Sequence, residues 1–450
     1  MSDLTIRETE RPDLLVGETS EGAQELKRRA LTPPTELRRE VGAILEVDGR
    51  VLDPSSIDIE RSDDETMIIN MGPAHPSTHG VLRLMLELDG EIVLRVKPVV
   101  GYLHTGMEKT GEELSYVQGA TNVTRMDYLS PVINELNYSL AVEKLLGIEI
   151  PARATWIRMM MSELNRISSH LVWMATNGMD LGSTSMMIYG LRERELILAF
   201  FEKTAGLRLN LNYVRPGGVA ADLPDGWEDD VLVICDTILE RTYEYDQLLT
   251  GQPIFRDRMV GVGAILAEEA LALGVTGPVL RSTGVPWDLR RTMPYLAYDD
   301  VEFDVIVGTY GDNFDRFAIR LNEIRESIRI IRQCIERMPR GDYRSQDPKV
   351  TPPPRARIDE SMEALIHHFK LFTEGFHVPT GEVYSAVESP RGELGCYLVS
   401  DGGPKPYRIH VRAPSFVNLQ AIPLLMRGGF LSDAVPIIST IDPVLGEVDR

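Results

Sequence analysis

Three long stretches in the middle of the chain repeat apolar residues at helical spacing. The first follows Pro151 and carries Ile157, Met160, Leu164, Ile167, Leu171 and Met174. In the second, residues 317–338, apolar positions alternate in steps of four and three, while arginines and glutamates occupy the other side. The third runs from about residue 357 to 374 and carries Ile358, Met362, Leu365, Phe369 and Phe372. These periods predict amphipathic helices that form a helical bundle as the core of the molecule, with the methionines at 159–161 as core filling.

Shorter stretches on either side of the bundle alternate with a period of two, as half-buried strands do. Residues 82–88 alternate, Asp89-Gly90 favours a tight hairpin turn, and residues 92–96 follow as a second strand. After Pro379 the strand-forming stretches are residues 383–388, 395–399 and 407–411. The predicted fold class is therefore α+β, a central bundle of long helices flanked by N-terminal and C-terminal antiparallel sheets.

These changes of period divide the chain into four regions. Residues 1–65 contain 17 acidic and 9 basic residues and are predicted to be a polar extension, with a short strand pair near residues 44–51. Residues 66–150 are predicted to form an N-terminal α/β region with an antiparallel sheet, and residues 151–378 the helical bundle. Residues 379–450 are predicted to be a β-rich region ending in a C-terminal tail.

Composition limits the partners that the chain can have. Its 47 basic and 68 acidic residues give a net charge of −21, which argues against binding nucleic acid or adsorbing directly to anionic lipid. No run of about 18 uncharged apolar residues occurs, and the N-terminus lacks the features of a signal peptide. We therefore expect a soluble, cytoplasmic protein that reaches a membrane only through partners.

The three cysteines do not form a recognisable site. Cys235, Cys334 and Cys396 lie far apart and no Cys-x-x-Cys occurs, so we expect buried free thiols. If the protein takes part in electron transfer, its own cysteines do not hold the carrier. The stretch Gly261-Val262-Gly263 falls short of a dinucleotide-binding fingerprint, so a nicotinamide donor would bind elsewhere.

Two segments resemble known metal-binding motifs in their flanking residues but lack the metal ligands. The ending Asp442–Arg450 resembles the Asp-Pro-Cys-x-x-Cys-x-x-His ending of the large subunit of nickel-iron hydrogenases, with Val444 and Glu447 at the cysteine places and Arg450 at the histidine place. Residues 125–130 resemble the hydrogenase Arg-x-Cys-Gly-x-Cys, with Asp127 and Ser130 at the cysteine places. Nickel and iron in such a site need soft thiolates, which these residues do not supply.

The replacement of both cysteine pairs in one chain is typical of the 49 kDa subunit, also called the D subunit, of respiratory complex I. The chain therefore resembles this family, which is related to that hydrogenase subunit. Further blocks that resemble the family are residues 70–80, 213–219, 287–290 and 361–370, so that the resemblance extends from about residue 66 to 450. It implies a catalytic core subunit of a proton-pumping NADH:quinone oxidoreductase, peripheral on the cytoplasmic side of the cell membrane. The implied partners within the complex are the cluster-bearing B subunit, the C subunit and the membrane-arm H subunit.

The resemblance also implies a quinone-binding cavity and assigns its residues. Quinone is the substrate, its electrons come from a 4Fe-4S cluster in the partner subunit, and this chain binds no metal or cofactor of its own. His79 lies in a Pro- and Gly-rich turn with His75 and would otherwise be interpreted as a solvated side chain. Tyr128 would otherwise be a core tyrosine, and Asp180 an N-cap for the next helix.

These three residues suit quinone chemistry. Quinone reduction takes up two electrons and two protons, so each carbonyl oxygen needs a donor that can yield a proton. Tyrosine titrates near ~10 and histidine near ~6.5 in model peptides, so Tyr128 and His79 would respond differently to charge on the quinone. Asp180 matches the family aspartate that pairs with the histidine, and a neighbouring carboxylate favours the protonated imidazole.

One position departs from many relatives. The block at residues 105–109 aligns with Arg-Gly-x-Glu-Lys, and here the arginine is Thr105. In the relatives that arginine lies close to the partner's terminal iron-sulfur cluster, so Arg125 is expected to supply the positive charge near the cluster instead.

Three alternatives stay open from the sequence. The first is the equivalent subunit of a complex-I-like dehydrogenase that uses reduced coenzyme F₄₂₀ or ferredoxin. The second is a non-catalytic structural subunit. The third, a working hydrogenase, conflicts with the four missing thiolates.

Overall fold

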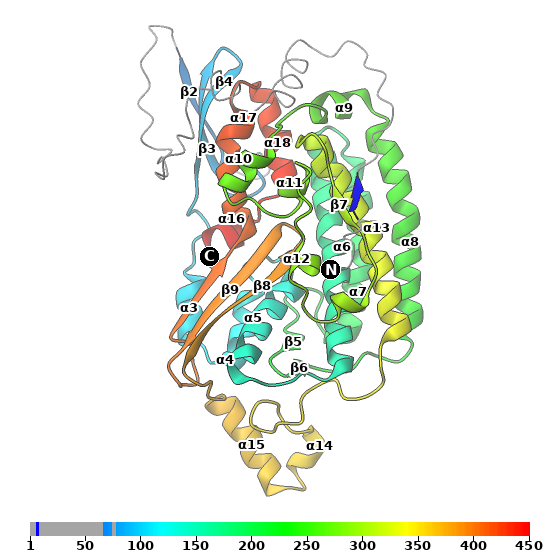
Figure 1. The fold of residues 1–450 in the computed structure, drawn as a ribbon, viewed down its shortest axis with the longest axis vertical. Helices are drawn as coiled ribbons and strands as arrows, with labels where there is room; N and C mark the ends of the chain where they lie inside the picture. The colour runs from blue at the N-terminus through cyan, green and yellow to red at the C-terminus, as the bar shows by residue number, and fades with distance from the viewer. Residues whose placement is uncertain (1–5, 9–65, 74–77) are drawn as a thin grey trace.

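The computed structural model describes residues 6–8, 66–73 and 78–450, and its core is a bundle of four long helices (Figure 1). The four are α6 (Ala152–Asp180), α7 (Ser185–Ala205), α8 (Trp227–Thr250) and α13 (Asn313–Arg337). Residues 157–174 and 317–338 were predicted as helices from their period, and α6 and α13 confirm both. The α6 helix begins directly after Pro151, whose extended conformation prevents an earlier start.

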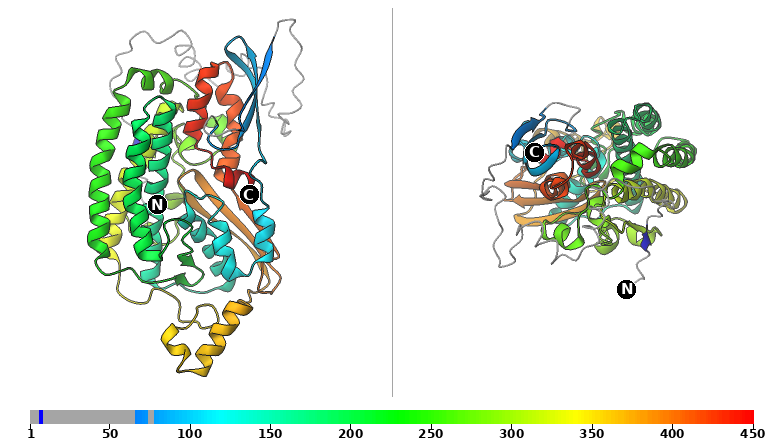
Figure 2. Two further views of the ribbon diagram at one scale, coloured as in Figure 1. Left: turned by 180° about the vertical axis from the view of Figure 1, so that it is seen from behind. Right: turned by 90° about the horizontal axis from the view of Figure 1, so that it is seen from above.

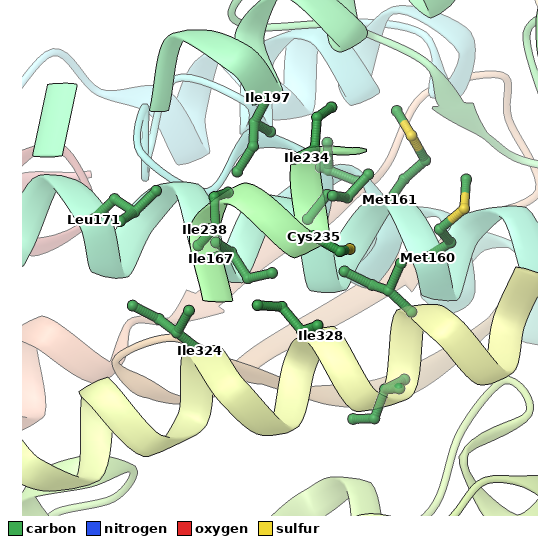
Figure 3. Close-up of a cluster of buried hydrophobic side chains, with 14 of the residues drawn as sticks. Met160, Met161, Ile167, Leu171, Ile197, Ile234, Cys235, Ile238, Ile324 and Ile328 are labelled. Carbon is green, nitrogen blue, oxygen red and sulfur yellow. The ribbon is translucent and has the colours of Figure 1, made fainter. Parts of the chain in front are cut away.

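The bundle is held together by apolar side chains from all four helices (Figure 3). The labelled side chains are Met160, Met161, Ile167, Leu171, Ile197, Ile234, Cys235, Ile238, Ile324 and Ile328. All are buried, which confirms that the methionines of α6 fill the core. Cys235, Cys334 and Cys396 are buried free thiols, as predicted, and burial raises the pKa of each.

Two three-stranded antiparallel sheets lie beside the bundle, and this mixture of helices and antiparallel sheets confirms the predicted α+β class (Figure 2). In the N-terminal sheet the order is β2 (Met67–Met71), β3 (Arg83–Asp89) and β4 (Ile92–Val99), and Gly90 makes the tight turn with a φ of 59°. In the C-terminal sheet β9 (Gly392–Ser400) lies between β8 (Gly381–Ser389) and β10 (Arg408–Arg412). Every second residue of β3 is a buried leucine, which is the alternation seen in the sequence.

The C-terminal segment returns to the space between the N-terminal sheet and the bundle. There α17 (Ile422–Met426) packs on β4, and α18 (Ala434–Ile441) packs on α6 and α13. The last helix, α19 (Leu445–Asp449), packs on α16 (Pro414–Asn418). The chain end is therefore brought next to elements that lie far earlier in the sequence.

Shorter elements complete the described part of the chain. They are α3 (Met107–Glu113), α4 (Tyr116–Val123), α5 (Pro131–Leu146), β5 (Val214–Arg215), β6 (Gly218–Val219), α9 (Pro253–Met259), α10 (Ala267–Ala272), α11 (Pro278–Arg281), α12 (Leu289–Thr292), η1 (Tyr298–Asp300), η2 (Leu419–Ala421) and η3 (Leu431–Asp433). None of the helices that the structure describes has the length and apolar character needed to cross a membrane.

The third predicted helix differs from expectation in extent and in surroundings. Instead of one core helix over residues 357–374, the chain forms α14 (Arg355–Ile358) and α15 (Met362–Thr373), separated by a short break, and the side chain of Ser361 caps α15. The apolar stripe of α15 faces outward: Met362 is 76% exposed and Phe369 63%. The prediction that this helix belongs to the core of the bundle is wrong, because a helical period reports an apolar face but not what covers it.

One strand was not foreseen. The three residues Ile6–Glu8 form β1 and pair in parallel with β7 (Val305–Val307). A strand of this length is too short to leave a period in the sequence. Residues 44–51, where a strand pair was predicted, lie outside the described residues.

Candidate functional site

His79 and Asp180 face each other across the junction of the N-terminal sheet and the bundle. The Nε2 atom of His79 lies 2.6 Å from Oδ2 of Asp180, and the two side chains are only 12% and 8% exposed. Their alignment falls outside that of a hydrogen bond, so this is a close approach of the two side chains, which forms an ion pair only when the imidazole is protonated. Asp180 is the last residue of α6, and the N-cap of α7 is Thr184, so the N-cap interpretation of Asp180 is wrong.

The turn that carries His79 has an unusual backbone. His79 adopts a φ of 53°, in the left-handed region that a residue with a side chain occupies at a cost of about 1 kcal/mol. The fully buried side chain of Thr78 donates a hydrogen bond to the carbonyl oxygen of Gly80 at 3.4 Å. Gly80 approaches Leu445, because a Cβ added there would lie 2.9 Å from that side chain. The turn is thus packed against the first residue of α19; His75 lies outside the described residues.

Tyr128 lies against the next residue of the same helix. A Cβ added to Gly446 would lie 2.4 Å from the carbonyl oxygen of Met126 and 3.3 Å from Cδ1 of Tyr128. The two predicted proton donors, His79 and Tyr128, therefore belong to segments that both pack against the start of α19. Tyr128 is 40% exposed, so it is not the core tyrosine of the alternative interpretation.

A buried arginine lies among the positions that correspond to the cysteines of the hydrogenase motifs. The guanidinium of Arg391 is fully buried, and its Nη1 atom lies 2.9 Å from Oδ2 of Asp127 and donates to Oγ of Ser130 at 3.4 Å. Its Nη2 atom lies 3.1 Å from Oδ2 of Asp442. A cation paired with two carboxylates is the arrangement that makes burial of such charges tolerable. The sequence motifs did not indicate Arg391, because it lies in the β8–β9 hairpin, which is far in sequence from both segments that lack the hydrogenase cysteines.

The position of the second C-terminal cysteine carries a carboxylic acid. Burial, together with the neighbouring charge of Asp127, raises the pKa of Glu447 to about 8, while Arg391 acts in the opposite direction. Glu447 is therefore protonated at neutral pH, and one of its oxygens accepts a hydrogen bond from the backbone N–H of Ser415 at 3.0 Å. Within the described residues, no three His, Cys, Asp or Glu side chains are grouped so as to hold a metal ion.

The phenol of Tyr128 keeps its proton in this surrounding. Partial burial raises the pKa of Tyr128, and the neighbouring carboxylates of Asp127 and Asp442 raise it further, whereas Arg391 lowers it. A tyrosine hydroxyl whose pKa lies above its ordinary value near ~10 is a hydrogen-bond donor at neutral pH. The arrangement can therefore offer one donor from Tyr128 and one from the His79 and Asp180 pair.

The chain end also fixes the loop before α3, which carries Thr105. The carboxylate of Asp449 accepts hydrogen bonds from the backbone N–H groups of Gly101 at 2.7 Å and Leu103 at 2.6 Å. Both Thr105 and Arg125 are at the surface, and Arg125 donates to the carbonyl oxygen of Thr121 within its own segment. Arg125 is therefore exposed, with its side chain held against its own segment.

Comparison with known proteins identifies the family of the chain. Residues 180–450 match the family model described as respiratory-chain NADH dehydrogenase, 49 Kd subunit. A D subunit of the NADH-quinone oxidoreductase of Roseiflexus sp. (strain RS-1) is 54% identical over 86% of this chain and 93% of that protein. The D subunit of Frankia alni is 53% identical over 86% of each chain, and a D subunit of Salinispora arenicola is 52% identical over 92% of this chain and 98% of that protein. The predicted resemblance is thus confirmed, and the chain belongs to the family of the 49 kDa subunit of respiratory-chain NADH dehydrogenase, the D subunit of NADH-quinone oxidoreductases.

Proposed function

We propose that this chain is the subunit of an NADH-quinone oxidoreductase that binds the quinone headgroup between Tyr128 and His79 and supplies the protons for its reduction. Electrons arrive from a 4Fe-4S cluster held by a neighbouring subunit, and the two carbonyl oxygens of the quinone become hydroxyl groups. Tyr128 donates to one carbonyl oxygen. His79 donates to the other, and the carboxylate of Asp180 orients its ring and stabilises the positive charge on it.

The observation that carries the proposal is the 2.6 Å approach of His79 to Asp180, in a turn that packs against the same small helix that touches Tyr128. Packing against α19 keeps both segments at a fixed distance from each other, which is what a site for a rigid planar headgroup needs. The buried Arg391 takes the place of the positive charge that a metal would supply, so that Asp127 and Asp442 stay paired in the absence of an ion.

The proposal extends to the assembly. The neighbours are the other subunits of the complex, with the cluster-bearing B subunit nearest to Arg125 and Thr105 and the membrane-arm H subunit nearest to the His79 turn. The C subunit is a further partner, and the complex is peripheral on the cytoplasmic side of the membrane. Re-protonation of Tyr128 and His79 after each turnover links the site to proton translocation.

The experiment that tests the proposal is the substitution Tyr128→Phe in the assembled complex. It removes one hydroxyl and leaves the ring, so quinone reduction by NADH is expected to fall by about 100-fold, the usual scale for loss of a general acid. Reduction of an artificial acceptor by NADH, which does not use the quinone site, should be unchanged. Tyr407→Phe, at an exposed tyrosine outside the site, is the matched control. Full quinone activity in Tyr128→Phe would remove Tyr128 from the mechanism.

A further inference from the structure

Tyr128 lies in a short turn that its neighbour Asp127 closes. The Oδ1 atom of Asp127 accepts hydrogen bonds from the backbone N–H groups of Leu129 and Ser130, both at 3.1 Å. A carboxylate that bonds to backbone N–H groups two and three residues ahead is a common way to fix a turn. Ser130 is also the N-cap of α5, so the turn leads directly into a helix. The backbone at Tyr128 therefore depends on where the Asp127 carboxylate is held.

Arg391 holds the second oxygen of that carboxylate. Its Nη1 atom donates to Oδ2 of Asp127 at 2.9 Å and to Oγ of Ser169, on α6, at 3.1 Å. One oxygen of Asp127 is thus bonded to the turn, and the other is bonded to a guanidinium that is anchored on a long helix of the bundle. Arg391 therefore connects the turn of Tyr128 to α6.

The same guanidinium also holds the segment that precedes α19. The Nε atom of Arg391 donates to the carbonyl oxygen of Asp442 at 3.1 Å, and Nη2 lies 3.1 Å from Oδ2 of the same residue. Asp442 has a left-handed backbone with a φ of 58°, and the chain enters α19 directly after it. The start of α19 packs against Tyr128 at Gly446. Tyr128 is therefore held from two sides by segments that both bond to Arg391.

The backbone at Arg391 is itself fixed. Its carbonyl oxygen accepts a hydrogen bond from Nδ2 of Asn418 at 3.1 Å. A Cβ added to Gly277 would lie 2.4 Å from the same oxygen, so the β8–β9 hairpin is packed closely against the backbone of a second segment. The guanidinium at the other end of the side chain is planar and donates in fixed directions. Arg391 can therefore impose a position on its partners.

The charges around Arg391 give a second reason for a cation at this place. The titratable or charged side chains that interact with the guanidinium include Asp127, Asp442, Glu447, Tyr128 and Arg320. On the proposed function, the phenol of Tyr128 gives its proton to a quinone oxygen, which leaves a phenolate beside two carboxylates. A guanidinium close to all three oxygens stabilises that phenolate, because an opposite charge favours the charged form of an acid.

We propose that Arg391 is a positioning residue for quinone reduction, which fixes the hydroxyl of Tyr128 through the Asp127 turn and through the start of α19. Arg391 acts through Tyr128 and does not touch the quinone. Displacement of a reacting group by about 1 Å can lower a rate by ~100-fold, so the contacts of Arg391 bear directly on the rate of proton donation. The inference rests on the proposed function for the reaction, but on the contacts of Arg391 alone for the link to Tyr128.

The test is the substitution Arg391→Lys in the assembled complex, made both in the original chain and in the Tyr128→Phe variant. Lysine keeps the positive charge, but its compact ammonium does not reproduce the planar set of contacts. In the original chain, kcat for quinone reduction by NADH is expected to fall about 10-fold, with KM for quinone changed by less than about twofold. In Tyr128→Phe the same substitution should lower kcat by less than about twofold, because the hydroxyl that it displaces is already absent.

Arg158→Lys is the matched control for that substitution. Arg158 is also a fully buried arginine, and it pairs with Glu143 at 2.6 Å and donates to the carbonyl oxygen of Gly218 at 2.8 Å. Glu143 lies near the end of α5, whereas Tyr128 precedes its start. Any effect of Arg158→Lys on kcat should therefore be the same factor in the original chain and in Tyr128→Phe.

Ser169→Ala is a milder second variant in case Arg391→Lys prevents assembly, which NADH reduction of an artificial acceptor reports. It removes one acceptor of Arg391 and leaves the charges, so kcat should fall about threefold in the original chain and stay unchanged in Tyr128→Phe. Equal losses in the two backgrounds, or full activity of both variants in the original chain, would overturn the role of Arg391. Full quinone activity in Tyr128→Phe alone would instead refute the proposed function, and this inference with it, so the two failures are distinguishable.

Discussion

The imidazole of His79 lies 2.6 Å from the carboxylate of Asp180, although the two residues are separated by a sheet, two short helices and all of α5 and α6 along the chain. The contact joins a turn with a left-handed backbone at His79 to the last residue of a 29-residue helix. A helix end is a rigid platform, whereas the turn depends on its packing against Leu445. We therefore expect Asp180 to fix the position of the imidazole.

If His79 and Asp180 act as one unit, substitution of either residue should have a similar effect on activity. Asp180→Asn and His79→Gln should each lower NADH:quinone activity at least ~10-fold, because each breaks the same pair, and reduction of an artificial acceptor should be unaffected. The double variant should be no worse than the poorer single variant, since groups that act as a unit are not additive. Asp225→Asn, at an exposed carboxylate, controls for the loss of one charge. Additive losses in the double variant would show that the two residues act separately.

Gly446 supplies a test of the packing between α19 and Tyr128. Alanine favours a helix over glycine by about 1 kcal/mol, so Gly446→Ala would be stabilising if there were room. There is none, because its Cβ would lie 2.4 Å from a backbone oxygen, which cannot rotate away. We expect the free energy of unfolding to fall by about 1–3 kcal/mol and quinone reduction to be lost.

Gly381→Ala is the matched control for that substitution. The nearest atom to its added Cβ is a side-chain carbon of Leu145 at 3.5 Å, which is an ordinary contact. Chemical denaturation measures both variants. A Gly446→Ala chain as stable and as active as the Gly381→Ala chain would mean that α19 does not position Tyr128.

The raised pKa of the Glu447 carboxyl group implies that the stability of the folded chain depends on pH. Its pKa rises from an ordinary 4.5 to about 8 on folding, so between these values the folded chain holds a proton that the unfolded chain has lost. Native stability therefore falls as pH rises through this window, by at most about 1.4 kcal/mol per pH unit from this group. Glu447→Gln keeps the acceptor for Ser415 and removes the titration.

The measurement is the difference in unfolding free energy between Glu447→Gln and the original chain at pH 5 and pH 8. The variant is expected to gain relative stability from pH 5 to pH 8. Glu228→Gln, at an exposed position of α8, shows the effect of losing a charge without burial. A difference that stays constant with pH would mean that Glu447 is ionised in the folded chain.

The positions of Arg125 and Thr105 lead to a prediction for the midpoint potential of the partner subunit's iron-sulfur cluster. On the proposed function Arg125 supplies positive charge beside the partner's cluster, which favours the reduced state. Arg125→Ala should then lower the midpoint potential by about 40 mV for each kcal/mol of electrostatic stabilisation lost in a one-electron step. Thr105→Arg, which restores the residue of many relatives, should raise it. Redox titration of the cluster measures both, with Arg355→Ala as a distant control; an unchanged potential in Arg125→Ala refutes the role.

Much of the fold follows from local sequence patterns. The α6 and α13 helices carry a long apolar period, and the β3–β4 hairpin carries alternation together with a turn at Gly90, so each is specified within its own segment. His79, Tyr128 and Asp180 were predicted only through family resemblance, since no local pattern distinguishes a site histidine from a solvated one. Their roles, and the division of the chain at residues 65, 150 and 378, remain predictions.

Other features depend on contacts that no local pattern encodes. Arg391 pairs with Asp127 across 264 positions, and nothing near Arg391 in the sequence indicates that it is buried. The exposure of Phe369 depends on what the helix lies against, which its period does not report. The pairing of β1 with β7 joins two three-residue strands far apart in the chain. Each of these is decided by tertiary contacts.

We propose that a pocket without the metal ligands of the hydrogenases receives a quinone headgroup between the phenol of Tyr128 and the imidazole of His79. The most direct measurement is an experimental structure of the assembled complex with a bound quinone analogue. We predict one carbonyl oxygen at hydrogen-bond distance from the hydroxyl of Tyr128 and the other at that distance from a ring nitrogen of His79. A headgroup bound elsewhere, or packed side chains or a transition metal beside Tyr128, would contradict the claim.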